Sequence, residues 1–567
     1  MFAIPGKTVN KRGEGKMDNQ QDQAVASQTG SHQGLSEREK IMLFWASFLA
    51  LTAAGVGFVL RSLAGTQHWG AAFEITNDQV GALFGAGLWP IAITMILFSL
   101  VVDKVGYKAS MMCAFALQGI AAVLTIYANS FNTMLVACLV AGLGHGIVEA
   151  CINPLCASIY RDQKSKMLNI LHASWPAGIV IGGVVYLTMF KGATSWAEVS
   201  GSFWFMFLPV IAYGVMFLMC HHYPVDERVE AKVPMSEMLK EFGGLGAFIA
   251  ITFLFYEISN QVPALGAALA GDMGPLPKKL AVSIIVGIIG GAFFGGVVKS
   301  RGKILFFILC LIMIPLATAE IATDGWIQKL MRPTMGEYAG WALVFSAGIM
   351  MGLRFFAGVP LKFMSPPGLL LLSSVFSIIG LFALSMADGL LVWFAFVFYA
   401  IGQTFYWPTV LGFVAEQFPK GGAMTLNTVS AMGLLTVGIF GFPFLGAVQD
   451  AYTTKAVEKT QPALVQSLRA EGTTFTNAEG ADVPILNRNR LFGVKYDAIN
   501  AEEVKKQITD EAALAVLDKD LTQVGRSTLR VAAVLPSIMA ISFLLIMIWY
   551  RSQGGYKPVH LVHEEDA

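Results

Sequence analysis

The stretch Ser99-Leu-Val-Val-Asp103-Lys104-Val-Gly106-Tyr-Lys108 separates two long apolar segments of this chain. A membrane-spanning helix needs about 20 apolar residues, and both segments reach that length. Gly106 permits a tight turn between them, while Lys104 and Lys108 favour the cytoplasmic side of a membrane. Asp103 stands at a helix end, where a carboxylate pairs with cations or with neighbouring helix N-termini. The stretch predicts a short cytoplasmic loop between two membrane helices.

The composition of the whole chain agrees with a membrane protein. Of 567 residues, 55% are hydrophobic and only 14% are charged, whereas a soluble domain carries about 25% charged residues. This argues against a soluble enzyme, a nucleic-acid binder and a disordered chain. The net charge of +1 implies no acidic or basic partner. All six cysteines lie in apolar runs without a CxxC pair, so we expect neither disulfides nor a metal site.

The apolar runs predict fourteen membrane-spanning helices. These are 41–65, 79–102, 109–128, 131–159, 167–190, 203–220, 246–270, 280–298, 304–323, 338–358, 368–387, 390–415, 423–447 and 529–550. With the N-terminus inside, the inner segments hold 21 Lys and Arg residues and the short outer loops hold five. The positive-inside rule therefore predicts an inner-membrane protein with both termini cytoplasmic.

The chain also contains a weak internal repeat. A shift of 258 residues aligns five features with their counterparts: Gly144 with Gly402, Leu168-Asn169 with Leu426-Asn427, Ala173 with Ala431, Gly183 with Gly441, and Lys104 with Lys362. A common offset across several helices predicts two similar halves. The predicted organisation is a disordered tail 1–40, a six-helix half 41–222, a linker 223–245, an inserted helix pair 246–298, a six-helix half 299–550 with an external loop 449–528, and a tail 551–567.

The loop quoted first resembles the signature of the major facilitator superfamily, G-x-x-x-D-[RK]-x-G-x-[RK], with Ser99 in place of the first glycine. This resemblance implies an all-α polytopic fold of two six-helix halves with the solute site between them. The two-helix insertion would bring the total to fourteen spans. Alternating access between the halves would then move the solute.

Two further stretches resemble the fucose–proton symporter family. They are Glu149-Ala-Cys-Ile-Asn153-Pro154 and Leu168-Asn169-Ile-Leu-His172-Ala-Ser-Trp175. The resemblance implies a sugar as solute and a proton as coupling ion. The chain lacks the acidic residue that this family carries in its first helix, since span 41–65 holds only Arg61 as a charged residue. The C-terminal half resembles bacterial facilitators of unassigned substrate, through stretches that include Gln403, Tyr406 and Trp407.

Ionisable residues inside apolar spans are costly and therefore become functional candidates. Glu149 is the first candidate for proton coupling, with Asn153 one helical turn away on the same face. His172 is the second, as a proton relay or as a hydrogen-bond donor to the solute; a histidine satisfied in the core is the alternative. The residues expected to contact the solute are Asn153, Asn169, Trp175, Gln403, Tyr406 and Trp407.

Three more charged residues are expected to act in gating. Arg61 lies near the outer end of the first span, where it would neutralise Glu149, bind an anionic solute, or extend to the membrane surface. The repeat maps Arg61 onto position 319, next to Glu320, so an Arg61–Glu320 pair is a candidate outer gate. Arg354 is expected as an anchor at the inner side. The motif residues Asp103, Lys104, Gly106 and Lys108 complete this group.

The sequence therefore predicts a secondary transporter, not an enzyme, moving a small polar solute with protons through the bilayer. No nucleotide-binding or hydrolase signature is present, and no cofactor or nucleic-acid partner is expected. A drug or metabolite–proton antiporter is the alternative within transport, and a non-transporting membrane sensor is the alternative outside it. We expect a monomer.

Overall fold

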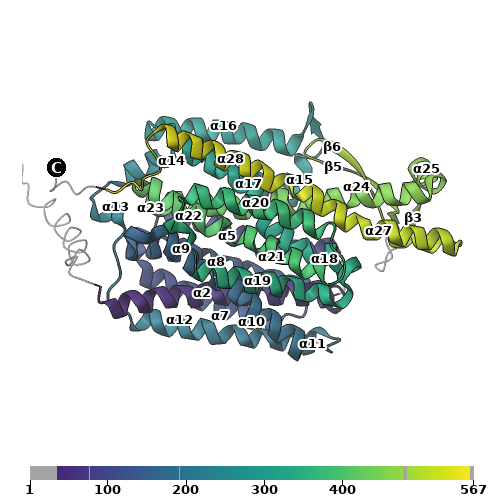
Figure 1. Cartoon of the computed structure of the whole chain (residues 1–567), viewed down its shortest axis with the longest axis horizontal. Helices are drawn as coiled ribbons and strands as arrows, with labels where there is room; N and C mark the ends of the chain where they lie inside the picture. Colours follow the sequence, from purple (N-terminus) through teal and green to yellow (C-terminus); the bar gives the residue numbers. More distant parts are fainter. Residues whose placement is uncertain (1–34, 74, 76, 191, 477–481, 562–567) are drawn as a thin grey trace, which may run out of the picture.

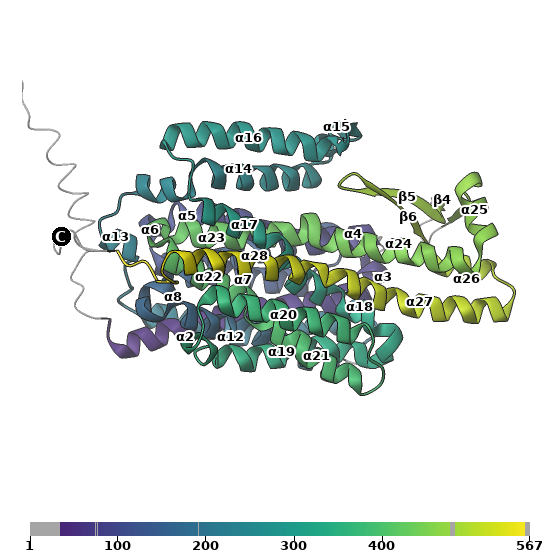
Figure 2. The same cartoon turned by 45° about the horizontal axis from the view of Figure 1, so that its top comes forward.

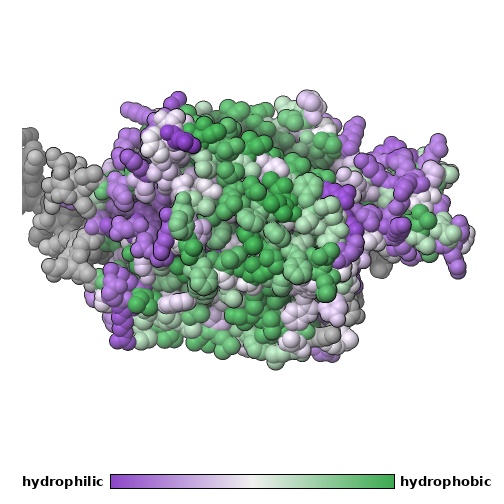
Figure 3. Space-filling model, in the orientation of Figure 1, coloured by the Kyte–Doolittle hydropathy of each residue, from purple (hydrophilic) through white to green (hydrophobic). Residues whose placement is uncertain are grey.

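The computed structural model describes residues 35–73, 75, 77–190, 192–476 and 482–561. Long helices run side by side between two ends of the molecule (Figure 1). The surface is apolar across the middle of the bundle and polar at both ends (Figure 3). Helix α2 (Glu37–Ala64) begins and helix α28 (Val534–Ser552) finishes at the same end, named here the tail end.

The N-terminal half comprises residues 37–219. After α2 its elements are the π-helix η1 (Gly65–Trp69), α3 (Gly70–Phe73), α4 (Asn77–Ala86), α5 (Trp89–Ser99), α6 (Val102–Val105), α7 (Tyr107–Ile126), α8 (Phe131–Ile159), η2 (Arg161–Gln163), α9 (Lys164–His172), α10 (Ser174–Met189), α11 (Trp196–Val199), η3 (Ser200–Met206) and α12 (Phe207–Met219). These helices bury apolar side chains in two clusters: the larger continues through α14 into the C-terminal half, and the smaller lies mostly within the N-terminal half.

A connecting region follows, in which two long helices pack against each other. It contains α13 (Glu227–Glu230), α14 (Met235–Gln261), α15 (Pro263–Ala268), the two-residue strands β1 (Asp272–Met273) and β2 (Leu276–Pro277), and α16 (Lys278–Val298). Helices α14 and α16 lie at the edge of the bundle (Figure 2). The face of α16 that points away from α14 is apolar and exposed, as expected for a helix in contact with lipid.

The C-terminal half comprises residues 304–552 and includes a polar projection. Its bundle elements are α17 (Ile304–Ala317), η4 (Thr318–Ala322), α18 (Thr323–Met335), η5 (Gly336–Tyr338), α19 (Ala339–Phe355), η6 (Pro360–Lys362), α20 (Pro366–Leu384), α21 (Leu391–Thr404), α22 (Tyr406–Gln417), η7 (Pro419–Gly421), α23 (Gly422–Thr436), η8 (Val437–Gly441), α24 (Phe442–Thr460), α27 (Glu511–Ala532) and α28. The halves meet where α10 packs on α19, α9 on α22, and α23 on α5 and α8.

The polar projection extends beyond the bundle at the end opposite the tail end (Figures 1 and 3). Between α24 and α27 it holds α25 (Pro462–Glu471), β3 (Thr474–Thr476), β4 (Asp482–Pro484), β5 (Leu486–Leu491), β6 (Val494–Ile499) and α26 (Ala501–Gln507). Strands β5 and β6 pair antiparallel from Leu486–Ile499 to Leu491–Val494. Phe492, at the tip of this hairpin, contacts the rings of Tyr256 and Phe440 and so ties the projection to the bundle.

The expected count of fourteen spans is not confirmed. Within the described residues, twelve helices are long and apolar enough to cross a membrane, and Leu83–Ser99 forms a shorter apolar segment. Several expected ends were wrong, because helices continue past the apolar core into polar sequence. Helix α14 begins at Met235 and α27 begins at Glu511. Helix α18 ends at Met335 and α24 ends at Thr460.

The start of α2 corrects the expected boundary of the disordered tail at residue 40. Ser36 caps the helix, and its side chain and that of Glu39 bond reciprocally to each other's backbone N–H groups. Such a capping box fixes a helix start, so residues 37–40 belong to α2. Most of the expected tail, residues 1–34, lies outside the described residues.

Several of the expected spans are broken, and three of the breaks precede a Trp-Pro dipeptide. The pairs are Trp89-Pro90, Trp175-Pro176 and Trp407-Pro408, and the breaks lie at 87–88, at Ala173 and at Phe405. A proline has no N–H and removes the hydrogen bond to the carbonyl four residues earlier. Pro176 therefore leaves the carbonyl of His172 without its helical donor, and Pro408 does the same to Thr404.

Candidate functional site

A chain of polar side chains lies buried between α8 and α9 in the N-terminal half. Asn153 donates from Nδ2 to Oε2 of Glu149 at 2.9 Å, and its Oδ1 lies 2.8 Å from Nε2 of His172. Nε2 of His145, one turn before Glu149, lies 3.7 Å from Oε1 of the same carboxylate. Asn153 therefore connects the two residues expected to couple protons, which do not touch each other directly.

Trp175 covers this chain from one side. Its ring stacks on that of His145 with centroids 5.3 Å apart and also contacts Phe58 at 5.2 Å. The ring therefore positions a histidine beside Glu149.

Arg354 is buried at the contact between the halves, and its guanidinium donates hydrogen bonds at two of the helix breaks. Its Nη1 donates to the carbonyl of His172 at 2.8 Å, and its Nε donates to the carbonyl of Thr404 at 2.6 Å. These are the two carbonyls that the prolines leave without donors. Polar backbone groups freed by proline inside a membrane need such replacement partners. One guanidinium therefore holds α9 of one half and α21 of the other.

The third partner of Arg354 is Glu320, whose Oε1 accepts from Nη2 at 2.8 Å. This corrects two expectations. Glu320 does not pair with Arg61, whose guanidinium lies beside Gly57 and Gly87. Arg354 is 1% exposed and is a buried hub, not an anchor at the inner membrane surface. The repeat placed Arg61 and Glu320 at one depth but carried no information about which side chains face each other.

More polar groups surround this ion pair in the C-terminal half. Tyr399 donates to Oδ1 of Asp324 at 2.7 Å, and Gln403 donates from Nε2 to the carbonyl of Ala319 at 2.6 Å. Within the described part of the chain, Oε2 of Glu320, Oε1 of Gln403 and the hydroxyl of Tyr406 are buried and make no hydrogen bond of good geometry, although Ser374 and Ser377 lie beside the Tyr406 hydroxyl and the Trp407 N–H lies beside Glu320. Buried polar atoms without well-placed partners are costly.

The structure also places the remaining two residues expected to contact the solute. Asn169 donates to Oγ1 of Thr409 at 3.1 Å and so bridges the halves. Trp407 packs closely against Gly433. Glu257, on α14, accepts from Asn260 and Gln261 of the same turn of its helix, away from the buried chain.

The loop of the quoted motif makes specific contacts at the tail end. The Asp103 carboxylate accepts from the guanidinium of Arg228 on α13. Lys108 donates to the carbonyls of Leu218 and Cys220, both at 3.0 Å, and so caps α12. Gly106 has φ +82°, a conformation that favours glycine. Lys104 is exposed.

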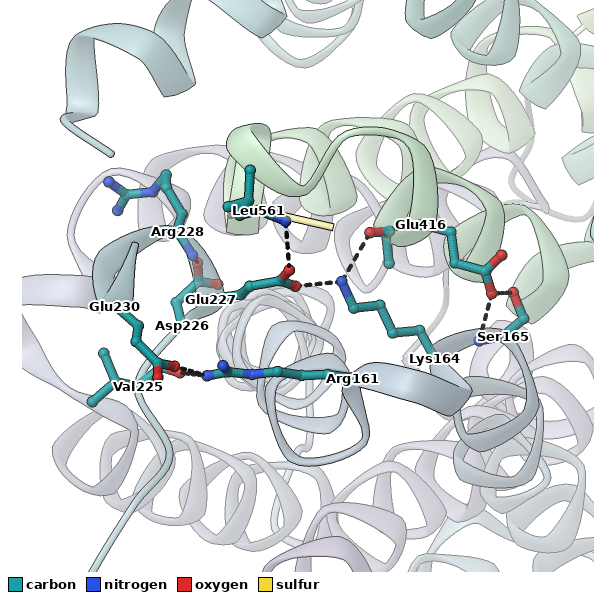
Figure 4. A network of polar contacts seen from close by, with 11 residues as sticks. Arg161, Lys164, Ser165, Val225, Asp226, Glu227, Arg228, Glu230, Glu416 and Leu561 are labelled. Atoms are coloured by element: carbon teal, nitrogen blue, oxygen red, sulfur yellow. Dashed lines mark hydrogen bonds and ion pairs between the residues drawn. The ribbon is translucent and has the colours of Figure 1, made fainter. Parts of the chain in front are cut away.

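A polar network closes the halves together at the same end (Figure 4). Lys164 of α9 donates to Glu227 at 2.5 Å and to the carbonyl of Ala415 at 3.3 Å. Ser165 donates to Glu416 of α22, and Arg161 pairs with Glu230. These are described here as the tail-end network.

The segment after α28 joins that network. Val559 donates its N–H to the carbonyl of Glu416 at 2.8 Å, and Tyr556 donates its hydroxyl to the carboxylate of the same residue at 2.6 Å. Beside the network, burial and the negative charge of Asp103 raise the pKa of Asp226 to about 6.

Sequence reasoning missed Asp324, Tyr399, Asp226 and Glu416 as members of these clusters. Asp324 could have been found as a carboxylate one turn from Glu320. The other three depend on partners distant in sequence, so no local signal identified them.

The comparisons with known proteins now identify the class. The model of the Major Facilitator Superfamily matches residues 43–447, so the chain belongs to this superfamily, and its apolar helices make it an integral membrane protein. Among curated proteins, the chain is 23% identical over 285 residues to the synaptic vesicular amine transporter of Rattus norvegicus, covering 48% of this chain and 54% of that one. The human protein matches at 22% identity. The chain spans about half the length of these relatives.

Several solved structures share the fold. A bacterial homologue of the human lysosomal transporter Spinster, inward-facing and unoccupied, superposes with a TM-score of 0.52 at 14% identity, covering 93% of this chain and 100% of that one. The proton:xylose symporter XylE gives 0.51 at 14% identity, with 72% and 90% covered. FucP in its outward conformation gives 0.50 at 14% identity, with 73% and 92% covered. At these identities the likeness concerns the fold alone.

Proposed function

We propose that this chain is a proton-coupled secondary transporter of a small polar solute, with a sugar as the first candidate, working by alternating access between its two halves. The observation that carries the proposal is the continuous polar path across the contact between the halves. It runs from Glu149 through Asn153 to His172, whose backbone carbonyl is held by Arg354, and on to Glu320.

Charge balance within this path supports proton coupling. Arg354 neutralises Glu320, but the buried carboxylate of Glu149 has only histidines and an amide beside it. An unpaired charge inside a membrane is costly, so Glu149 or a neighbouring histidine holds a proton in this arrangement. Opening the site to water would release that proton.

The solute would bind beside the part of the path that lies in the C-terminal half. The oxygens of Glu320, Gln403 and Tyr406 that lack well-placed partners accept hydrogen bonds from hydroxyl groups, and a sugar offers several donors. Solute binding would then supply well-placed partners for these atoms. Because Arg354 holds both halves beside the same oxygens, binding there would alter the contact between the halves.

The test uses the purified protein in liposomes with fucose and xylose as probes. A proton gradient should drive accumulation of the accepted sugar. Glu149→Gln should keep sugar exchange between the two sides while losing gradient-driven accumulation. Glu257→Gln is the matched control, since Glu257 is as buried as Glu149 at 7% exposure but lies on α14 away from the path. Accumulation that survives Glu149→Gln would overturn the coupling role of Glu149.

A second candidate is an exchanger of organic amines for protons. It is favoured by the similarity to vesicular amine transporters and by the buried carboxylates Glu149 and Glu320 and the half-buried Asp324, which would attract a cationic solute. Uptake of an aromatic amine into liposomes that are acidic inside would support this function, whereas sugar uptake into liposomes that are acidic outside supports the first.

A further inference from the structure

A groove of about 640 Å³ lies between α14 and α16, separate from the polar path. Its wall is made of apolar and glycine residues, including Leu245, Phe248, Ile288 and Ala292. At one end it is lined by Lys299, Ser300 and Arg301, in the loop that joins α16 to α17. A groove of this size is in the range of small-ligand sites, about 300–1,000 Å³.

The cationic loop is held in place by a break in α14. Gly243 has φ +56°, which interrupts the helix and leaves the following N–H groups without helical acceptors. The loop supplies those acceptors: Gly244 donates to the carbonyl of Ser300 at 3.0 Å and Leu245 donates to that of Arg301 at 2.9 Å. A side chain at position 243 would collide with the backbone of Gly302. The loop therefore has a fixed position against α14.

The charges of Lys299 and Arg301 are not used within the described residues. The neighbouring acids are already paired, Glu241 with Lys303 at 3.5 Å and Glu237 with Lys240 at 2.6 Å. Both Lys299 and Arg301 are exposed and have no ion pair in the described part of the chain. Two positive charges thus stand unmatched at the mouth of an apolar groove.

The surroundings of the groove indicate that its ligand comes from the lipid bilayer. Ile288, Ile289, Phe293 and Val297 of α16 are exposed on the apolar band of this membrane protein. The cationic end lies toward the tail end, where the bundle surface becomes polar (Figures 2 and 3). A ligand that fits must have an apolar chain in the membrane and a negative group at the polar boundary.

We propose that this groove binds an anionic phospholipid, with an acyl chain along the open groove where α14 and α16 meet and the headgroup phosphate at Lys299 and Arg301. Basic residues near a membrane surface attract anionic lipids with about 1 kcal/mol each. Such a lipid would cover the groove along the contact of α14 with α16.

The experiment measures thermal unfolding of the full chain in detergent during titration with phosphatidylglycerol or phosphatidylcholine. Phosphatidylglycerol should raise Tm at lower mole fraction than phosphatidylcholine. The double variant Lys299→Gln/Arg301→Gln should need about thirtyfold more phosphatidylglycerol for the same shift, with its response to phosphatidylcholine unchanged. Ala292→Leu, at an exposed groove position, should weaken the response to both lipids by filling the wall.

The matched control is Lys362→Gln/Arg551→Gln, which removes two exposed charges outside the groove lining and should match the unmodified chain within about twofold. Equal stabilisation by the two lipids, or an equal loss in the control variant, would overturn the proposal in favour of general lipid contact. Stabilisation by soluble glycerol 3-phosphate alone would overturn it in favour of a phosphate site without a lipid chain.

Discussion

Asn169 and Asn427, which are 258 residues apart, each donate a side-chain hydrogen bond into the opposite half of the bundle. Asn169 donates to Oγ1 of Thr409 at 3.1 Å. Asn427 donates to Oγ of Ser99 at 3.0 Å and to the carbonyl of Ala150 at 3.1 Å. Both side chains are fully buried. The two halves therefore hold each other through equivalent positions of the repeat.

Replacing either asparagine should loosen this contact. A buried hydrogen bond lost with one partner left unpaired costs about 1–3 kcal/mol, so Asn169→Ala and Asn427→Ala should each lower Tm in detergent. Ser283→Ala is the control, because the Ser283 hydroxyl bonds only to Lys279 of its own helix. If all three variants have the same Tm, the bridging bonds do not hold the halves together.

Replacing Arg354 alone should lower Tm far more than replacing Arg354 and Glu320 together. Arg354→Gln leaves Glu320 buried and unpaired, and breaking such a pair costs about 3–5 kcal/mol. Arg354→Gln/Glu320→Gln removes the stranded charge and should recover much of the lost Tm. Both variants should lose solute uptake, since the carbonyls of His172 and Thr404 lose their shared donor. A double variant no more stable than Arg354→Gln would contradict this account.

The closed tail end should respond to pH through Asp226. Its pKa is raised from 3.8 to about 6, first by burial. Because of this raised pKa, the folded protein binds the Asp226 proton more tightly than the unfolded chain does. The resulting gain in the free energy of unfolding is complete below pH 3.8 and is lost as pH rises through 6. The shift corresponds to about 3 kcal/mol. Asp226→Asn should therefore flatten the pH dependence of Tm between pH 4 and 6.5, and an unchanged profile would assign that dependence to other groups.

Gly106 tests the backbone of the quoted motif. Its φ of +82° strains any side chain, although no atom lies within 4 Å of the added Cβ. Gly106→Ala should destabilise the chain by about 1 kcal/mol or more. Gly352→Ala makes the same chemical change inside helix α19, also in open space, and should be neutral or stabilising, because alanine is the better helix former. Equal Tm changes for the two variants would show that backbone conformation at Gly106 is unimportant.

Much of the fold was predictable because it depends on local properties. Apolar run length predicts where membrane helices lie, and the spacing of Asp103, Lys104 and Gly106 indicates the superfamily that the family comparison then confirmed. Helix ends were predicted less well, since amphipathic helices such as α18 and α27 continue beyond the apolar core. The contact of Glu149 with Asn153 was also predictable, because residues four apart share a helix face.

The sequence alone predicted the membrane bundle, but not the helix breaks at which Pro176 and Pro408 deprive the carbonyls of His172 and Thr404 of their donors. Only the tertiary structure decided that Arg354 donates to both carbonyls. It also decided that Arg354, and not Arg61, neutralises Glu320. The reason is geometric. Helical periodicity fixes neighbours within about four residues, whereas Arg354 meets Glu320 and His172 across 34 and 182 residues of chain. Contacts of that kind follow from how the helices pack. Which of several candidate partners a buried arginine meets therefore depends on the positions of all the helices.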